Sequence, residues 1–361
     1  MGTTLVVYES KYGLSESIAR DLGRVLGPAR VCRADQLLEA QGAGCVAALG
    51  EASFVVIVAP VYRHRPDERI IAFAEAQRAW LCERRVALVC VGLATSPGAV
   101  AAYLQPLTEL LGDCVVWKGG LGGRIAMDWL DAADRQDIER TSELRGHRGL
   151  GAMDAYSAEA TAEAALAIKA VRDSFASSLP PDELRRHIDE FLGRHATCTL
   201  CTGAGGHVRA TPVEYAYADG AVYLLSEGGE KFAHLLINPH VSVAVYEPYE
   251  GMDKLAGLQL LGVAEIVPED SPERARALAL RGLDDVRLAA LPFALNLIRV
   301  RVERAEFLWS HFRELGYDVR QVYHFPAEAA GGPASITPVP SHDSAPPASS
   351  PAPVPPGESR T

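Results

Sequence analysis

Residues 1 to about 176 alternate short apolar runs with stretches in which apolar side chains recur every three or four positions. The apolar runs are rich in β-branched residues and occur at Thr4–Tyr8, Arg30–Cys32, Phe54–Val58, Val86–Val91 and Cys114–Trp117. The stretches with helical spacing include Ile18–Leu26, Glu68–Leu81, Ala99–Leu111 and Ala158–Phe175. Nearly continuous apolar strands separated by helices predict a parallel sheet that is covered by helices on both faces.

The pattern changes after Ser177–Pro181, which we interpret as a linker between a first domain, residues 1–176, and a second domain, residues 182–325. A helix around Leu184–Phe191 leads into strand-like segments at Ala196–Cys201, His207–Tyr217, Ala221–Leu225, Val241–Tyr246, Leu258–Val267 and Leu297–Val302. Gly-rich and Asp-Gly turns join the first of them, which is typical of antiparallel hairpins. The second domain is therefore predicted to be a small, mainly antiparallel barrel. Residues 326–361 are mostly Pro, Ala and Ser, and we expect a disordered tail.

Composition narrows the classes of function. A length of 361 residues fits about two domains. The net charge of −11 argues against a nucleic acid as partner. The chain starts without a basic leader and has no apolar stretch near the roughly 20 residues of a membrane span, so we expect a cytoplasmic protein with no integral membrane segment. Its seven cysteines are scattered through apolar runs, and we expect reduced thiols.

The segment Glu9–Ser15 joins the first predicted strand to the first predicted helix. It has several hydroxyls and one glycine, Gly13, so it contains neither the GxxxxGK[ST] nor the GxGxxG pattern. A loop at the start of a helix presents backbone N–H groups and the positive end of the helix dipole to an anion. The segment is therefore predicted to hold a phosphate, and simple capping of the helix by a serine is the alternative interpretation.

The first domain resembles the flavodoxins, and among them the menaquinone-dependent protoporphyrinogen oxidases. Tyr8–Gly13 with Ser15, the segment Ala59–His64 and an insert after the fifth strand carry the resemblance. It implies a flavodoxin-like, doubly wound parallel α/β sheet with strand order 2-1-3-4-5, and FMN as cofactor. The residues that it assigns to the FMN phosphate are Ser10, Lys11, Tyr12, Gly13, Leu14 and Ser15. Those that it assigns to the isoalloxazine ring are Pro60, Val61, Tyr62, Arg63, Leu93 and Ala94.

The insert at residues 121–156 departs from that family. The oxidases use a basic and apolar insert to meet the membrane and its quinone, whereas this insert carries more acidic than basic residues. We expect the acidic residues to form a solvated face. FMN binding is therefore implied more firmly than porphyrinogen chemistry.

The second domain resembles the FMN-binding split β-barrel of the pyridoxamine 5′-phosphate oxidase superfamily. The ordered set Arg209–Val213, Leu224–Ser226, Glu230–Phe232 and Asn238–Val241 carries the resemblance. It implies that a homodimer binds FMN between its subunits. The residues that it assigns to FMN are Arg209, Ser226 and Lys231 at the phosphate, Thr211 and Pro212 at the ring, and Gln259 as a further contact. No counterpart of the pyridoxal-phosphate-binding residues is found near the C-terminus.

Several residues have a second interpretation. Cys198 and Cys201 form a CxxC, but in a strand the side chains of residues three apart point to opposite faces, which disfavours a redox dithiol. No second pair completes a metal site, and we predict no metal. Tyr62 either stacks on the flavin or packs in the domain. Lys231 is a phosphate ligand or the solvated start of a helix. No triad or carboxylate pair identifies catalytic residues.

The combination of domains predicts an FMN-dependent oxidoreductase or electron-transfer flavoprotein with two flavin sites. Its redox partner would be a small molecule or a protein, with a nicotinamide donor or a quinone acceptor as possibilities. The alternatives are a protoporphyrinogen-oxidase-like dehydrogenase that uses the first domain alone, and a flavin-binding module without catalysis. In any enzyme of this kind the flavin supplies the chemistry, and the protein supplies position and electrostatics.

Overall fold

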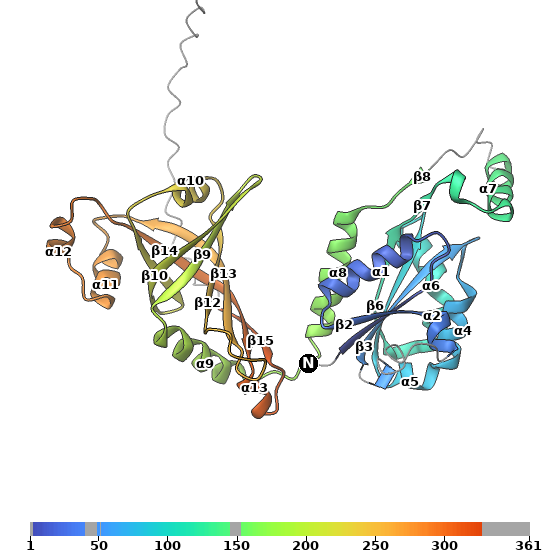
Figure 1. Cartoon of the computed structure of the whole chain (residues 1–361), viewed down its shortest axis with the longest axis horizontal. Helices are drawn as coiled ribbons and strands as arrows, with labels where there is room; N and C mark the ends of the chain where they lie inside the picture. The colour runs from blue at the N-terminus through green and yellow to red at the C-terminus, as the bar shows by residue number, and fades with distance from the viewer. Residues whose placement is uncertain (1–2, 40–48, 51, 145–152, 327–361) are drawn as a thin grey trace, which may run out of the picture.

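The computed structural model describes residues 3–39, 49–50, 52–144 and 153–326. Buried apolar side chains form separate cores up to Ile168 and from Leu179 onward, so the chain has two domains (Figure 1), and Leu179 of the predicted linker is buried in the second core. The predicted tail lies outside the described residues apart from Pro326. No described helix is long and apolar enough to cross a membrane.

The first domain is built on a parallel sheet. Its strands are β1 (Thr3–Tyr8), β2 (Ala29–Arg33), β3 (Ala52–Tyr62), β5 (Arg85–Gly92) and β6 (Val115–Gly122). Their spatial order is β2-β1-β3-β5-β6, which confirms the predicted 2-1-3-4-5 arrangement. The additional short strand β4 (Arg65–Pro66) folds back on the end of β3 as an antiparallel hairpin.

Helices cover both faces of this sheet, as the apolar runs predict. They are α1 (Leu14–Val25), α2 (Ala34–Leu38), α4 (Glu68–Ala76), α5 (Arg78–Cys82), α6 (Pro97–Leu111) and α8 (Ala158–Asp173). Alternate residues of β1 serve the two faces: Val6 packs with α1 and α8, and Leu5 packs with α4 and α6. The helix expected over Glu68–Leu81 is two helices, because Gln77 leaves helical geometry and caps the first of them.

The insert after β6 forms a small subdomain at the carboxyl edge of the sheet. It contains β7 (Arg124–Ile125), the 3₁₀ turn η2 (Met127–Trp129), α7 (Ala132–Leu144) and β8 (Met153–Asp154). The Ala155 N–H donates to the Gly123 carbonyl at 2.9 Å. A Cβ on Gly122 would lie 1.7 Å from the Ala155 carbonyl oxygen, so only glycine allows this close approach. The two ends of the insert are therefore held against the last strand.

The second domain is a closed antiparallel barrel. Its strands are β9 (Thr197–Ala204), β10 (His207–Ala218), β11 (Ala221–Ser226), β12 (His240–Tyr246), β13 (Ala256–Val267), β14 (Asn296–Trp309) and β15 (Arg320–His324). The order β11-β10-β9-β12-β13-β14 closes because β11 also pairs with β14, and β15 adds to β14. The helices are α9 (Pro181–Arg194), α10 (Glu230–Ile237), α11 (Pro272–Leu280), α12 (Asp285–Ala289) and α13 (His311–Glu314). The predicted split-barrel class is confirmed.

The cysteines only partly match expectation. Cys198 is buried and Cys201 partly exposed on the other face of β9, and both thiols are free. Burial raises the pKa of the Cys198 thiol to about 12, which opposes thiolate chemistry. Cys32 is disulfide-bonded, so the expectation of a reduced thiol is wrong there. Apolar neighbours in the sequence predict that a cysteine is buried. Whether it forms a disulfide depends on which Cβ atoms the fold brings together.

Glu9, at the carboxyl end of β1, is a fully buried carboxylate that ties three elements together. Its Oε2 lies 3.0 Å from Arg33 of β2 and 3.1 Å from Arg69 of α4. Its Oε1 accepts the N–H of Asp35, at the start of α2, at 3.0 Å. A buried charge is tolerated only with such partners, so Glu9 fixes the base of the loop that follows it.

We predict that Glu9→Ala lowers the free energy of unfolding of the first domain by about 3 kcal/mol, at the low end for a broken buried pair because Arg33 and Arg69 can rehydrate. Urea denaturation of the full chain measures the loss. Glu39→Ala removes an exposed carboxylate from the same domain and is the control. It should change the free energy of unfolding by less than about 0.5 kcal/mol. Equal effects of the two substitutions would contradict an anchoring role.

Candidate functional site

Three loops meet at the carboxyl edge of the parallel sheet, where ligands bind in folds of this class. The backbone N–H of Lys11 donates to the Tyr62 hydroxyl at 3.0 Å, which joins the loop after β1 to the end of β3. A Cβ on Gly92 would lie 3.2 Å from Val61 Cβ, so the start of the β5–α6 loop lies against β3. The structure therefore brings together the three segments to which FMN contacts were assigned.

The loop after β1 has the geometry of an anion site. Gly13 has a left-handed φ of 87° and forms the N-cap of α1 without a side-chain cap. Ser10 Oγ accepts the Gly13 N–H at 2.9 Å, and its own O–H remains able to donate. Ser15 is buried in the first turn of α1, and Leu14 is half-buried. Hydroxyls and a helix N-terminus thus lie in one short segment, as predicted.

The turn at the end of β3 is strained. Arg63 and His64 have φ of 52° and 65°, and both are non-glycine residues in the left-handed region. Two consecutive residues of this kind form the mirror-image turn that joins β3 to β4. Each costs on the order of 1 kcal/mol, so the neighbouring structure holds the turn in place. The His64 ring stacks on Tyr103 of α6, with centroids 6.4 Å apart.

The other residues assigned to the isoalloxazine ring differ in exposure. Pro60 is buried, and Val61 and Tyr62 are half-buried. Leu93 and Ala94 are exposed in the β5–α6 loop. Tyr62 meets the Tyr12 ring edge-on, with centroids 6.3 Å apart, and burial raises the pKa of its hydroxyl.

Carboxylates of the insert pair with the cations of these loops. Lys11 Nζ lies 2.5 Å from Asp134 and 2.7 Å from Asp131. Arg63 Nε lies 2.5 Å from Asp137. We call Asp131, Asp134 and Asp137 the acidic latch. The expectation of a solvated acidic face is therefore wrong for Asp134, whose side chain is 18% exposed, whereas Asp131 and Asp137 remain 50% and 38% exposed while they pair with the loops.

Lys11 and the carboxylates of Asp131 and Asp134 shift one another's pKa values. Hydrogen bonds to Asp131 and then Asp134 raise the pKa of Lys11. A backbone hydrogen bond from Asp134, then Lys11, lowers the pKa of Asp131. Burial alone would raise the pKa of Asp134, but hydrogen bonds from Lys11 and the Tyr12 hydroxyl lower it. Carboxyls with a depressed pKa stay ionised through the neutral range, so the pairs of Lys11 with Asp131 and Asp134 weaken only in acid, below the ordinary carboxyl pKa of about 3.8.

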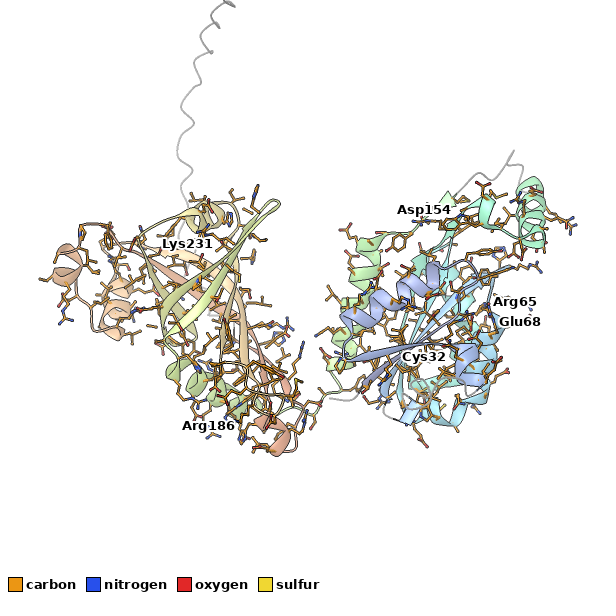
Figure 2. All side chains as sticks on the ribbon, viewed as in Figure 1. Cys32, Arg65, Glu68, Asp154, Arg186 and Lys231 are labelled. Atoms are coloured by element: carbon orange, nitrogen blue, oxygen red, sulfur yellow. The ribbon has the colours of Figure 1, made fainter. Side chains whose placement is uncertain are left out.

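A second cluster lies at the end of the barrel where α10 packs (Figure 2). Lys231 is 8% exposed and donates to the Gly228 carbonyl. Ser226 Oγ lies 3.4 Å from the Gly228 N–H, and Arg209 pairs with Glu230. Burial and then Arg209 lower the pKa of Lys231. The structure thus brings Arg209, Ser226 and Lys231 together, and Lys231 is not the solvated lysine of the alternative interpretation.

The remaining barrel residues divide between the two faces of the sheet. Thr211 points to the same face as the buried Tyr215, and its buried hydroxyl has no hydrogen-bond partner in the described structure. Pro212 and Gln259 are exposed on the outer face. The register aligns Pro212, Thr199, Ala244 and Gln259 across four strands. Three strand spacings place Pro212 and Gln259 roughly 14 Å apart, so one chain does not bring these two residues together.

Sequence reasoning missed three kinds of residue. Glu9 was treated only as part of the phosphate loop. For the latch carboxylates the sequence predicts only a solvated face, although Asp131, Asp134 and Asp137 recur every three residues, a spacing that can indicate one side of a helix. Glu230 was known only as a neighbour of Lys231. In the part of the chain that the structure describes, no group of three His, Cys, Asp or Glu side chains is suited to a metal.

Comparison with known families assigns the two domains. Residues 5–148 match the family model described as the flavodoxin domain. Residues 184–309 match the family model of pyridoxamine 5′-phosphate oxidase. The chain is thus a flavodoxin-like domain followed by a pyridoxamine 5′-phosphate oxidase-like split barrel, and both are flavoprotein folds. A search of curated proteins finds no match.

Solved structures resemble part of the chain at low identity. A FAD-binding protein of Mesorhizobium loti is 23% identical, covers 33% of this chain and 90% of its own, and has a TM-score of 0.29. The same four values hold for the heme storage protein HutZ of Vibrio cholerae. A conserved protein of Mycobacterium tuberculosis is 24% identical, covers 44% of this chain and 96% of its own, and has a TM-score of 0.32.

We predict that Asp134→Asn weakens the latch and strengthens FMN binding to the first domain by about threefold, since exposed ion pairs are worth roughly 0.2–1 kcal/mol. Lys11 then becomes available to the phosphate, while the insert is cleaved faster by protease. Asp128→Asn is the matched control, because it removes the same charge from the same insert outside the latch. Calorimetric titration and limited proteolysis of the full chain measure both effects. If Asp134→Asn weakens FMN binding and Asp128→Asn does not, the latch contributes to the FMN site and does not compete with the phosphate.

We predict that Glu230→Gln strengthens FMN binding at the barrel by about threefold, because it frees Arg209 from a carboxylate that is largely exposed. Riboflavin, which lacks the phosphate, should bind equally well before and after the change. Glu214→Gln serves as control, since it removes another carboxylate–arginine pair from β10, with Arg281. If riboflavin gains as much as FMN, Glu230 does not compete for the phosphate.

Proposed function

We propose that this protein is an FMN-dependent oxidoreductase with one flavin site in each domain, in which one domain accepts electrons from a donor and the other passes them on. The proposal rests on one observation. The chain contains two flavoprotein folds, and each has its own cluster of residues suited to a phosphate. When bound, the flavin supplies hydride or electron transfer, and the protein's residues bind and orient it.

The residues of the first domain fit FMN. They provide hydrogen-bond donors for its phosphate but no net positive charge beside it. Lys11 and Arg63 are matched by the acidic latch, which leaves Ser10, Ser15 and the N-terminus of α1 as donors. Hydrogen bonds to a charged group contribute roughly 1.5–3 kcal/mol each. Tyr62 and Pro60 would flank the ring on one side, and Leu93 and Ala94 on the other.

In the second domain, the fit rests on Thr211 and Lys231. The Thr211 hydroxyl is buried without a partner, and such an atom is usually satisfied by a ligand or water. Lys231 is a buried ammonium with no carboxylate against it at hydrogen-bond distance in the described structure, so a phosphate dianion would stabilise its charge. We infer that Ser226 and Arg209 complete this phosphate site.

A homodimer follows from the same proposal. Apolar side chains are exposed beside the Lys231 cluster, with Val208 87% and Leu236 81% exposed. Leu261, two residues beyond Gln259 on the outer face of β13, is also exposed. A second copy that covers these surfaces would bring its Gln259 toward the flavin of the first. The electron donor would be a nicotinamide or another reductant, the acceptor a quinone or a protein, and the location the cytoplasm.

Two alternatives make different demands on the chain. A protoporphyrinogen-oxidase-like dehydrogenase would use the first domain alone, and it is favoured by the family likeness of Tyr8–Gly13 and Ala59–His64. A flavin-binding module without catalysis would load flavin and show no turnover. The flavin content per chain and the effect of removing each site separate these possibilities.

We predict two FMN per purified chain and one in each of two double variants. Ser10→Ala with Ser15→Ala should empty the first site, and Arg209→Ala with Lys231→Ala should empty the second, both in the full chain. Because both sites lie on one electron path, each double variant should lose NADH-to-quinone turnover by at least about tenfold, the effect of 1.4 kcal/mol. Retention of turnover in the barrel variant would favour the dehydrogenase. Flavin loading without turnover under any reductant would favour the binding module.

A further inference from the structure

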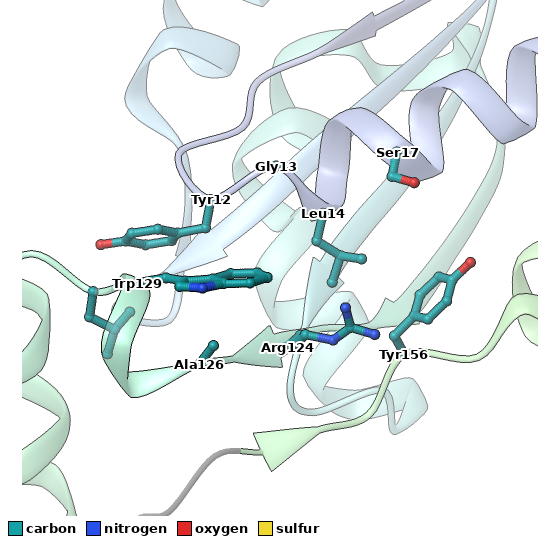
Figure 3. Close-up of a pocket in the computed structure, with 9 residues that line it drawn as sticks. Tyr12, Gly13, Leu14, Ser17, Arg124, Ala126, Trp129 and Tyr156 are labelled. Carbon is teal, nitrogen blue, oxygen red and sulfur yellow. The ribbon is translucent and has the colours of Figure 1, made fainter.

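A cavity of about 340 Å³ lies between the phosphate loop and the insert (Figure 3). Tyr12, Gly13, Leu14 and Ser17 form its wall on the loop side. The insert side is formed by Arg124, Ala126, Trp129, Leu130 and Tyr156. The volume is at the lower end of small-molecule sites, roughly 300–1,000 Å³, and suits a molecule of about two fused rings.

The lining is aromatic and apolar. Figure 3 shows the Trp129 indole extending from η2 toward the loop that carries Tyr12, with Tyr156 beside Arg124 at the other end of the pocket. Trp129 is 63% exposed, which leaves an indole face open beside a concave wall. Aromatic rings prefer offset or edge-on contact with other rings, so this lining favours a planar aromatic ligand.

The charge of the cavity is already balanced. Among the described residues that line it, Arg124 alone is charged, and its Nε lies 2.8 Å from Asp154. The guanidinium also lies over the Tyr156 ring, 5.6 Å from its centroid. Lys11, next to Tyr12, is held by the acidic latch. The described side chains that line the cavity therefore offer an anion no unpaired charge, whereas an uncharged ligand with a polar edge could accept a hydrogen bond from the Ser17 hydroxyl.

The wall formed by the insert is held in place from several directions. β7 pairs with β8, the Ala155 N–H binds Gly123 at 2.9 Å, and the latch binds α7 to Lys11. The cavity contains none of the residues assigned to the isoalloxazine ring at Pro60–Arg63 or Leu93–Ala94. The cavity therefore adjoins the phosphate loop through Tyr12–Leu14 and lies apart from the residues assigned to the isoalloxazine ring.

We propose that the insert completes a second binding site on the first domain, which takes a small, planar, uncharged aromatic molecule next to the flavin loop. The role of that molecule as an electron-transfer partner rests on the proposed function. Its binding does not, because the cavity is formed by the chain alone.

The test uses 2-naphthol as a neutral two-ring probe and 2-naphthoate as its anionic counterpart, titrated into the full chain with and without FMN. We expect 2-naphthol to bind at least fivefold more tightly than 2-naphthoate, and Trp129→Ala to weaken 2-naphthol at least tenfold. Trp129→Phe, which keeps a ring, should recover most of the affinity. Tyr249→Ala, an aromatic side chain 70% exposed in the second domain, is the matched control and should change nothing.

Equal binding of the two probes would overturn the inference of an uncharged ligand. Equal loss in Trp129→Ala and Tyr249→Ala would overturn the site itself. Competition between 2-naphthol and FMN would also overturn it, since the cavity would then belong to the flavin. A chain that binds no FMN but binds 2-naphthol in the predicted way would contradict the proposed function and leave this site intact.

Discussion

The pairing of cations with carboxylates determines what the candidate sites can offer an anion. Lys11 and Arg63 meet the acidic latch, and Arg209 meets Glu230. Lys231 is the exception among the described cations of these clusters, because it donates to a backbone carbonyl and its pKa is lowered by burial. Partly exposed pairs of this kind are weak, so they are exchangeable, whereas a buried ammonium gains strongly from an incoming anion.

Much of the fold could be predicted from the sequence, because the signals for strands and turns lie in short stretches of neighbouring residues. The apolar runs are nearly continuous where a strand is buried on both faces, as in Val86–Val91, and alternate where one face is exposed, as in β9. The Gly-rich and Asp-Gly turns marked the hairpins of the barrel. Closure by β11 with β14 joins residues about 75 positions apart and carries no local signal, so it followed from family resemblance alone.

The contacts of the site were harder to predict, since they join segments that are distant in sequence. Lys11 and Asp134 are 123 residues apart, and nothing near Asp134 records that α7 turns this carboxylate toward the first loop. In the sequence Glu9 likewise has the pattern of a loop residue. Its anchoring role depends on Arg33 of β2 and Arg69 of α4, which the fold brings to it. The division of Pro212 and Thr211 between two faces was, by contrast, available from the period of two along a strand.

Under the proposed function, the two domains would hold the phosphate of FMN through different interactions. In the first, serine hydroxyls and a helix N-terminus would act as neutral donors beside two cations that are already paired with three carboxylates, and such binding would depend little on ionic strength. In the second, the buried Lys231 and the partly exposed Arg209 would act as cations, and salt would screen mainly the contribution of Arg209. The proposed cofactor would thus be held by hydrogen-bond geometry in one half of the chain and by charge in the other. This difference arises because the insert supplies carboxylates to the first site, whereas Lys231 has no such partner among the described residues of the barrel.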